Sequence, residues 1–424
     1  MKRPTSWLNT GLCIGLLAIL LTACSNGTPD DSPLTATSIP DETRSPDVST
    51  RPPTPPETAS SDFAPSVPAE PERSEATLLA VGDIMVHMPQ LPAYYDRANN
   101  SYDLTGWFTQ VKPILGQGDW VIGNLETPIA GREFKYTGYP RFNAPRELAD
   151  ALVSAGVQLV STANNHSMDR AFPGVARTLA NVRKAGLIPI GTSASAGEQQ
   201  RLVIEERNGI RMGFLAYTYG TNGIPVPPDK SFAVNIIDRE AIKRDIRRLK
   251  LEHVDVVTVS LHFGIEYQRL PNEEQTGLAR ELVKTGADII LGSHPHVVQP
   301  YEEIDVAAED SEDGLARRGI VIYSLGNFIS NQTGNWKDVG LIFGVSLAKT
   351  SYPDGTSSTE WEAISLEPTW VHILWKNQKR HYTIIPMKHA LDKRNIPGLT
   401  SKDYAKMSTM LKGINEHLVK LQPK

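Results

Sequence analysis

The segment ADIILGSHPHVVQP (residues 287–300) contains an apolar run that leads directly into two histidines, His294 and His296, on either side of a proline. In extended backbone, residues i and i+2 point to the same side. Proline fixes its own φ and favours an extended conformation in the residue before it. We therefore expect the two imidazoles to converge on one point in space. For a His-x-His pair taken alone, the alternative is a loop with two exposed histidines, so the rest of the chain must decide.

The same pattern, an apolar run followed by polar residues, recurs along the chain. Apolar runs lie at 77–86, 119–126, 157–166, 187–192, 210–219, 254–264, 287–294 and 319–328. Helix-like segments lie between several of them, at 144–156, 173–186, 238–252 and 272–287. Continuously apolar strands that alternate with helices predict sheets covered by helices, which is an α/β fold.

Polar side chains with ligand chemistry stand at or just past the ends of these runs. They are Asp83, Asn124, Glu126, Asn164, Asn165, His166, His262, His294 and His296. Ligand sites in α/β folds are built at strand ends, so we expect these side chains to meet. Such a mixture of carboxylate, carboxamide and imidazole ligands suits Mn, Fe or Zn, whereas a Ca site would contain oxygen ligands only. There are enough ligands for two divalent ions, which can clamp both oxygens of an in-line displacement.

Six motifs in chain order carry a resemblance to a known family. They are GDIM (82–85), GNLETPI (123–129), STANNHSMD (161–169), SLHFGIEY (260–267), GSHPHVVQP (292–300) and YSLGNF (323–328). Together they resemble the CapA family, named for poly-γ-glutamate capsule synthesis, which is similar to the calcineurin-like metallophosphoesterases. The resemblance covers about residues 77–335, with PTWV (368–371) as a weaker continuation.

The resemblance implies an α/β fold with a four-layer α/β/β/α sandwich of the metallophosphoesterase type, in which helices lie outside two facing sheets. We expect this domain at 78–348. The segment 349–424 mixes aromatic strand-like pieces with a final polar helix, so we expect it to pack as a small C-terminal appendage.

The resemblance also implies roles for individual residues. Asp83 and His296 would hold a first metal ion, and Glu126 would bridge it to a second. The second ion would be held by Asn165, His262 and His294. His166 would donate a proton to the leaving oxygen or stabilise the charge of the transition state.

The sequence departs from the metallophosphoesterase pattern at two positions. Met85 stands where the usual Asp-x-His motif has its histidine, and the nearest imidazole is that of His87. Methionine is a poor ligand for hard ions, so either His87 reaches inward or the first ion is weakly held. Asn124 stands where many phosphatases have the bridging aspartate, so Glu126 would take that role with a longer side chain.

Weaker candidates for the substrate cleft are His87, Asn124, Glu266, Tyr267 and Asn327. For Glu266 and Tyr267, the alternative is that they simply cap a strand. For Asn327, a turn asparagine is an almost equally good explanation.

The N-terminal segment predicts export and a lipid anchor. Residues 1–24 contain a basic start and an apolar run, 11–21, that is shorter than the roughly 20 residues a membrane span needs. The ending LTAC (21–24) resembles a bacterial lipobox, so Cys24 would be lipidated after cleavage. Residues 25–77 are rich in Pro, Ser, Thr, Asp and Glu and cannot bury enough apolar surface to fold, so we interpret them as a disordered tether. The predicted location is therefore the extracytoplasmic face of the cell membrane.

Charge and cysteine content narrow the range of partners. The net charge of the chain is −5. Residues 25–77 carry ten acidic and three basic side chains, which leaves the segment after residue 77 neutral. A neutral domain has no electrostatic footprint for nucleic acid. Cys13 lies in the segment that would be removed and Cys24 would carry the lipid, so we expect the mature domain to have no free thiol and no disulfide.

Two functions are consistent with these observations. The first is a lipid-anchored surface protein whose binuclear-metal, hydrolase-like domain acts in the synthesis, export or anchoring of a capsule polymer such as poly-γ-glutamate. The alternative is a non-catalytic accessory subunit that binds the polymer or the membrane subunits of its synthase. The sequence does not decide between a phosphoester and an amide as the bond cleaved.

The lipobox gives a first prediction. The variant Cys24→Ala is expected to be released from the membrane or to remain as an unprocessed precursor, because the lipid would be attached to the Cys24 thiol. Cys13→Ala is the control, since Cys13 lies in the segment that would be removed. Intact-mass spectrometry of the membrane-bound chain measures the outcome. An unlipidated mature N-terminus at another residue would contradict it.

Overall fold

The computed structural model describes residues 70–422, which belong to one compact unit, Val67–Lys424. The predicted signal peptide, Cys24 and nearly all of the predicted tether lie outside the described residues. Within 70–422, no helix is both long and apolar enough to cross a bilayer.

The larger of two main sheets has eight strands. They are β1 (Glu72–Ile84), β4 (Trp120–Leu125), β5 (Leu159–Ser161), β6 (Ile188–Ile190), β13 (Asn327–Ile329), β14 (Val339–Ser351), β15 (Ser357–Lys376) and β16 (Lys379–Pro386). Their order is β16-β15-β14-β1-β4-β5-β6, with β13 also paired to β1. β1, β4, β5 and β6 are parallel, whereas β14, β15 and β16 form an antiparallel extension.

The second sheet has six strands. They are β7 (Val203–Arg207), β8 (Ile210–Thr218), β9 (Val256–His262), β10 (Ile289–Ser293), β11 (Tyr301–Val306) and β12 (Arg317–Ile322). The order is β11-β12-β10-β9-β8-β7, with parallel strands in the centre and an antiparallel strand at each edge. A short pair, β2 (Tyr95–Asp96) and β3 (Ser101–Tyr102), stands apart from both sheets.

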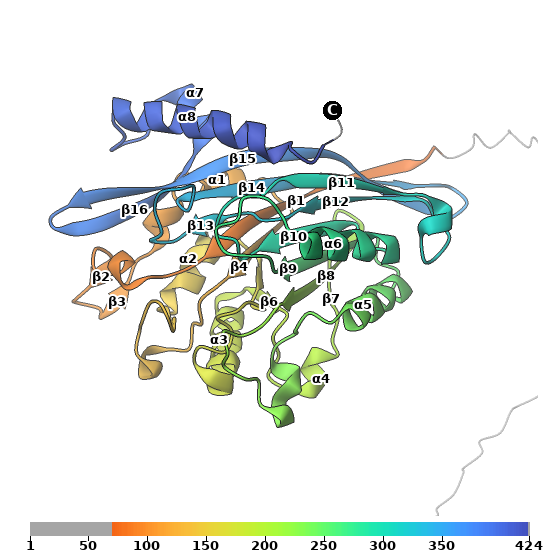
Figure 1. Cartoon of the computed structure of the whole chain (residues 1–424), viewed down its shortest axis with the longest axis horizontal. Coiled ribbons are helices and arrows are strands. Elements are labelled where there is room, and N and C mark those ends of the chain that lie inside the picture. The colour runs from red at the N-terminus through yellow and green to blue at the C-terminus, as the bar shows by residue number, and fades with distance from the viewer. Residues whose placement is uncertain (1–69, 423–424) are drawn as a thin grey trace, which may run out of the picture. The chain divides into compact units, whose positions relative to one another are not determined.

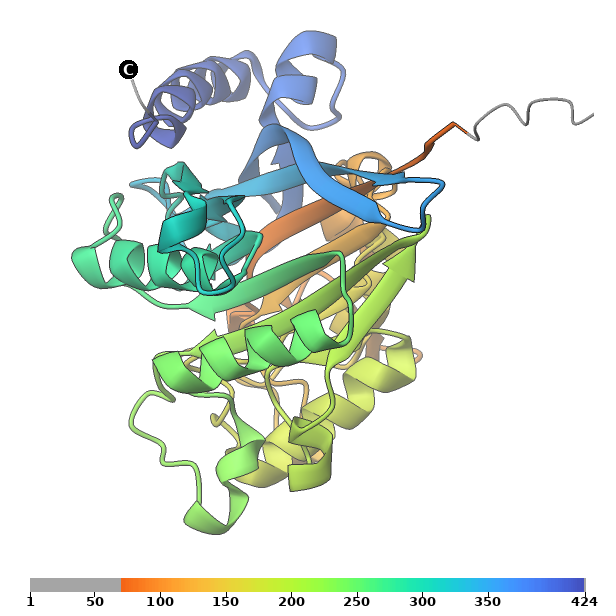
Figure 2. The same cartoon turned by 90° about the vertical axis from the view of Figure 1, so that its right-hand side faces the viewer.

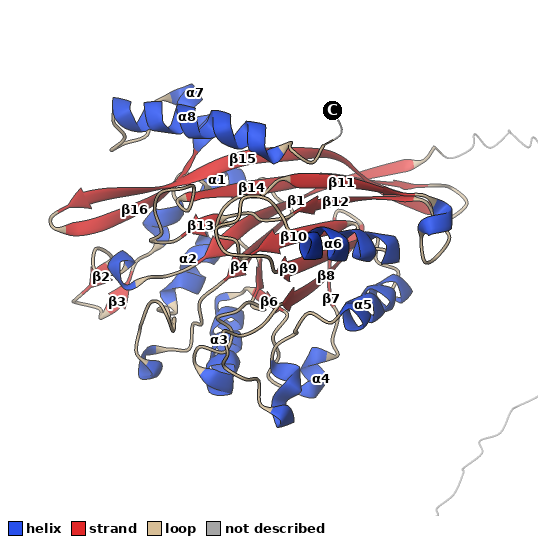
Figure 3. Ribbon diagram, in the orientation of Figure 1, coloured by secondary structure: helices blue, strands red, loops and turns tan. Residues whose placement is uncertain are grey.

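The helices pack against the two sheets, as Figure 3 shows. They are α1 (Lys112–Leu115), α2 (Glu147–Ala155), α3 (Ala171–Ala185), α4 (Ala196–Gln199), α5 (Arg239–Leu251), α6 (Glu273–Thr285), α7 (Met387–Lys393) and α8 (Ser401–Leu418). Short 3-10 turns connect other elements: η1 (Met88–Gln90), η2 (Thr105–Phe108), η3 (Arg132–Phe134), η4 (Pro228–Ala233) and η5 (Ala308–Asp310).

Alternating side chains divide the core into layers. In β1, Leu78 joins a central cluster with Phe214 and Leu291 of the second sheet, whereas its neighbour Leu79 joins an outer cluster with Leu152 of α2. A third cluster packs α5 and α6 on the outer face of the second sheet. This alternation follows from the period of two in a strand. The predicted α/β class, with helices outside two facing sheets, is confirmed.

Strands of the large sheet run across the positions 77/78 and 348/349, where we expected the domain to begin and end. β1 begins at Glu72, because its polar first half pairs with the end of β14, Glu72 opposite Ser351. β14 runs across the second of these positions, and β15 and β16 extend the large sheet. α7 and α8, drawn in blue at the top of Figure 1 and Figure 2, bury Met387 and Met407, respectively, in the central cluster.

The carboxyl ends of the central strands meet at one edge of each sheet. In the large sheet Asp83 lies opposite Asn124, and in the second sheet Ser293 lies opposite His262. Backbone segments approach closely here, since a Cβ on Gly292 would stand 1.9 Å from the carbonyl oxygen of Tyr323. The sheets therefore bring the predicted ligand residues together.

This close approach gives a second prediction. Gly292→Ala is expected to lower the free energy of unfolding by about 1–3 kcal/mol, because the added methyl group meets backbone that cannot move aside easily. Gly277→Ala is the matched control, since nothing lies within 4 Å of its added Cβ, at an exposed position of α6. Urea unfolding in EDTA measures both variants without a contribution from bound metal. Equal stability of the two variants would contradict the steric argument.

Candidate metal centre

The ligand residues predicted at strand ends form two groups that share one carboxylate. The first ligand group is Asp83, Glu126 and His296, and the second ligand group is Glu126, His262 and His294. Within each group the donor atoms lie within 4.8 Å of one another, and every member is buried. Glu126 thus occupies the shared position that the sequence predicted for it.

In the first ligand group, His296 Nδ1 lies 2.9 Å from Asp83 Oδ2, so its N–H donates to the carboxylate. The other ring nitrogen of His296 lies 3.7 Å from Glu126 Oε1.

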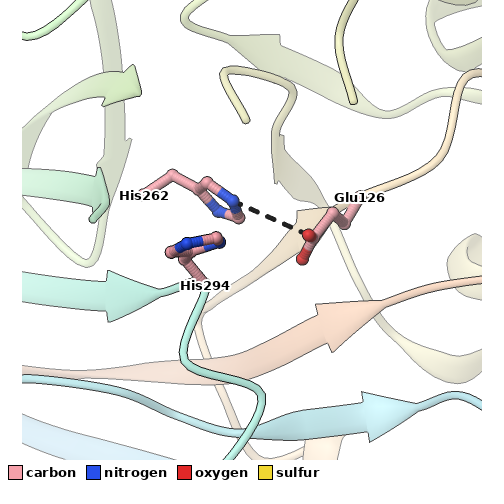
Figure 4. A group of neighbouring side chains, drawn as sticks. All are labelled: Glu126, His262 and His294. Atoms are coloured by element: carbon pink, nitrogen blue, oxygen red, sulfur yellow. Dashed lines mark ion pairs between the residues drawn. The ribbon is translucent and has the colours of Figure 1, made fainter. Parts of the chain in front are cut away.

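In the second ligand group, His262 Nε2 lies 3.6 Å from Glu126 Oε1, and the two side chains point toward each other with His294 beside them (Figure 4). Asn165 belongs to the same place, because its Oδ1 lies 3.0 Å from His262 Nε2. The predicted ligand set of the second ion is therefore assembled around Glu126.

Asn124 lies between the two carboxylates. Its amide nitrogen is 2.8 Å from Asp83 Oδ1 and 3.2 Å from Glu126 Oε2. The side chain is buried, and its oxygen accepts from Asn164 at 3.4 Å. An N–H donor at this point offsets part of the repulsion between two adjacent carboxylates. Asn124 thus supports the ligand residues from within and does not line an open cleft.

The buried atoms of the centre fit a divalent cation. Glu126 Oε1 and His294 Nδ1 are buried without a hydrogen-bond partner. Burial, followed by the charge of Asp83, raises the pKa of Glu126 well above its usual value. Burial lowers the pKa of His262 strongly and that of His294 to about 4, so both rings are neutral at pH 7 and offer lone pairs. A bound cation would supply the positive charge that these carboxylates lack.

The His-Pro-His segment is not extended, which corrects the sequence expectation. His294 has φ 101° and His296 has φ 57°, and residues other than glycine rarely adopt such positive φ angles. Their ring centroids are 6.0 Å apart, and each ring belongs to a different ligand group. Strain of about 1–3 kcal/mol per residue is typical of such sites. The expected extended backbone was therefore wrong, whereas the two imidazoles do converge: one donor atom of each ring lies within 4.8 Å of the other and of a Glu266 oxygen.

His166 lies beside the second ligand group and is held in a fixed orientation. Its Nδ1 is 2.8 Å from Asp169 Oδ2, and the same oxygen accepts the N–H of Phe142 at 2.6 Å. The Phe142 ring meets the imidazole edge-on, with centroids 4.6 Å apart. Because the Nδ1–H donates to the Asp169 carboxylate, Nε2 is the ring nitrogen that remains available for proton exchange.

Two of the weaker candidates have structural contacts. His87 lies outside the ligand groups found among the described residues; its Nδ1 accepts the N–H of Asn331 at 3.3 Å, and burial lowers its pKa to about 4. Asn327 donates to the carbonyl of Lys337 at 2.7 Å and to Gln332 at 3.0 Å. Asn327 therefore orders the loop after β13.

Glu266 and Tyr267 lie at the mouth of the centre. Both are exposed, and the Tyr267 ring lies 6.0 Å from the His296 ring. Lys337 covers the other side of Tyr267 at 5.2 Å. Burial, with the charge of Glu266, raises the pKa of Tyr267 to about 12, so its hydroxyl keeps its proton.

Sequence reasoning missed the segment after β8. The N–H of Tyr219 donates to the His262 carbonyl at 3.0 Å, and its ring stacks on the His262 ring at 6.2 Å with an interplanar angle of 10°. The Asn222 side chain reaches His166 Nε2 at 3.5 Å. The available signal was the Asn-Gly pair at 222–223, which marks a turn directly after an apolar run.

The comparisons with known sequences agree with one another. The family described as bacterial capsule synthesis protein PGA_cap matches residues 77–332. The capsule biosynthesis protein CapA of Bacillus anthracis is 28% identical over 267 residues, 60% of this chain and 60% of that protein. The PGA biosynthesis protein CapA of Bacillus subtilis is 29% identical over 265 residues, 59% of this chain and 62% of that protein. The match thus spans about three fifths of each relative.

Solved structures with a similar arrangement include one named as a nucleotidase and one named as a phosphoesterase. The Haemophilus influenzae NAD nucleotidase gives a TM-score of 0.42 at 12% identity, over 82% of this chain and 68% of that one. The calcineurin-like phosphoesterase YfkN of Bacillus subtilis gives 0.39 at 15% identity, over 83% of this chain and 100% of that one. A likeness of this degree says nothing about the substrate.

The ligand groups give a third prediction. His294→Ala is expected to lower the metal content of the purified chain and its melting temperature in Mn²⁺ or Zn²⁺, because a metal that binds only the folded state stabilises it. At 100 times the dissociation constant this linkage is about 2.7 kcal/mol. His389→Ala, at an exposed position of α7, is the control.

Elemental analysis and thermal unfolding with and without EDTA measure the effect. EDTA should remove most of the difference between His294→Ala and wild type. A wild-type chain that is purified without chelator, offered Mn²⁺ or Zn²⁺ and found to retain no metal would rule out the metal centre.

Proposed function

Because the chain belongs to the bacterial capsule synthesis protein family PGA_cap, we propose that it is a metal-dependent hydrolase acting on a surface polymer such as poly-γ-glutamate. The reaction would serve the synthesis, export or anchoring of that polymer. A relative of this chain is named for PGA biosynthesis, which supports this substrate class.

The observation that carries the proposal is the pair of ligand groups that share Glu126. Asp83 and His296 would hold one divalent ion, and Asn165, His262 and His294 would hold the other. Two such ions supply Lewis-acid stabilisation of the charge that develops during hydrolysis. Mn, Fe and Zn are the metals that this donor set suits.

His166 supplies the proton chemistry in this proposal. Asp169 orients the imidazole through Nδ1, so a proton held on Nε2 can pass to the leaving atom of the substrate. Burial among Phe142 and its neighbours excludes water from the ring. Protonation of the leaving atom is required for the cleavage of an amide and assists that of a phosphoester.

The proposed location is the extracytoplasmic face of the cell membrane, with the chain anchored through lipid on Cys24. The proposed partners are the surface polymer and the membrane subunits of its synthase, and no nucleic acid. These proposals rest on the lipobox-like LTAC sequence (21–24) and on the family.

One observation favours a second candidate function, a non-catalytic accessory subunit of the synthesis or export complex. Met85, 1% exposed, carries a thioether two residues after Asp83, where the metallophosphoesterase pattern has a histidine, and a thioether is a poor ligand for hard ions. A centre that holds its ions weakly would serve as scaffold.

His166 separates the two candidates and gives a fourth prediction. His166→Ala is expected to lower surface-polymer production, or hydrolysis in a panel of phosphodiesters and poly-γ-glutamate, by about 100- to 10,000-fold. Metal content and melting temperature should stay near wild type, because the side chain belongs to neither ligand group. His389→Ala again serves as the control.

Polymer yield in a deletion strain complemented with each variant measures the outcome, alongside elemental analysis. If the strain with His166→Ala makes normal polymer while the deletion makes none, the chain acts as an assembly factor and the hydrolase proposal is wrong.

A further inference from the structure

The two ligand groups differ in the number of donor side chains that the protein supplies. The second has three charged or imidazole donors and the Asn165 oxygen 3.0 Å from His262. The first has Asp83, Glu126 and His296. First-row divalent ions commonly take four or more ligands. The first position is therefore short of at least one protein donor compared with the second.

The side chains that follow Asp83 do not make up the difference. The N–H of Asn331 occupies His87 Nδ1 at 3.3 Å, and the His87 ring packs edge-on against Phe142 at 5.1 Å. Met85 offers only a buried thioether. A further hard donor must come from another element.

Glu266 is placed to be that donor. Its carboxylate forms a third group with His294 and His296, in which the donor atoms all lie within 4.8 Å of one another. Among residues 70–422 the carboxylate has no ion-pair partner. Its charge also contributes, after burial and Asp83, to the raised pKa of Glu126.

The backbone fixes this placement. The N–H of Tyr267, the next residue, donates at 2.7 Å to the carbonyl of Pro295, which lies between the two histidines. Tyr267 has φ 65° and Gly264 has φ 99°, so the loop after β9 turns back sharply toward the His-Pro-His segment. The Glu266 backbone is therefore held next to Pro295, whose two neighbours in the chain are His294 and His296. Nearby, the buried His294 Nδ1 has no partner.

We propose that Glu266 is a protein ligand of the first metal ion, an inference that rests on the metal centre of the proposed function. The first position then has three carboxylates and one imidazole: Asp83, Glu126, Glu266 and His296. The second position has one carboxylate, one carboxamide and two imidazoles. Oxygen-rich sites favour Mn²⁺, whereas imidazole suits Zn²⁺, so the two positions differ in metal preference.

The test is Mn²⁺ binding by isothermal titration to the full chain, purified in detergent and stripped with EDTA. Wild type is expected to bind two ions. Glu266→Gln, which keeps size and removes charge, should bind one ion with wild-type affinity and the other at least 10-fold more weakly. Glu266→Asp has a shorter side chain that keeps the carboxylate, so its affinity for the weaker-bound ion should lie between those of wild type and Glu266→Gln. Glu273→Gln, in the exposed first turn of α6, is the matched control and should resemble wild type.

The possible outcomes distinguish failure of the Glu266 inference from failure of the metal centre on which the proposed function rests. If Glu266→Gln and Glu266→Asp both bind two Mn²⁺ ions with wild-type affinities, Glu266 is not a ligand and the inference is overturned, while the hydrolase proposal stands. If wild type binds no Mn²⁺ or Zn²⁺, the metal centre fails and both proposals fall. Circular dichroism of each variant confirms that the compared chains are folded.

Discussion

Two adjacent carboxylates, Asp83 and Glu126, are both fully buried, and most of the functional region is arranged around that fact. Burying an unpaired carboxylate costs several kcal/mol unless hydrogen bonds or charges compensate it. The Asn124 amide contacts both side chains, and His296 donates to Asp83. Glu126 Oε1 has no hydrogen-bond partner among the described residues. A cation bound here would compensate this buried oxygen, which is why we expect metal binding and stability to be coupled.

The two sheets supply what holds this unfavourable cluster in place. Apolar side chains of both sheets interlock in the central cluster, so the carboxyl ends of the strands cannot separate. The close approach of Gly82 to the carbonyl of Gly326 and of Gly292 to that of Tyr323 leaves no room for a side chain. Left-handed backbone at His294 and His296 adds strain at the same edge. Strain of this kind persists only where packing over-determines the backbone, and here it places each imidazole in a different ligand group.

The sequence predicted those parts of the site that depend on strand direction alone. Asp83, His262 and His294 follow apolar runs, and the carboxyl ends of parallel strands meet at one edge of a sheet. Their convergence could therefore be predicted from the sequence alone. The backbone of the His-Pro-His segment was mispredicted, because local preferences for extended conformation yield to packing against neighbouring strands. The roles of Tyr219 and Asn222 depend on how one loop folds over another strand, which no periodicity encodes. β14 was missed for a similar reason, since its pairing with β1 spans most of the domain.

The residues on the two sides of the metal centre differ in their chemistry. On one side, His166 and Asn222 lie beside the second ligand group. On the other, Glu266 and Tyr267 lie beside His296 of the first. In the proposed hydrolysis the leaving end of a bound chain must face His166, since that is the side with a proton to give. Tyr219 and Tyr267, each 47% exposed, border these two sides with phenol groups that can donate to polar substrate atoms. For the proposed function, such a rim would suit a polar chain laid across the two ligand groups better than a compact apolar ligand, which would require an enclosed pocket.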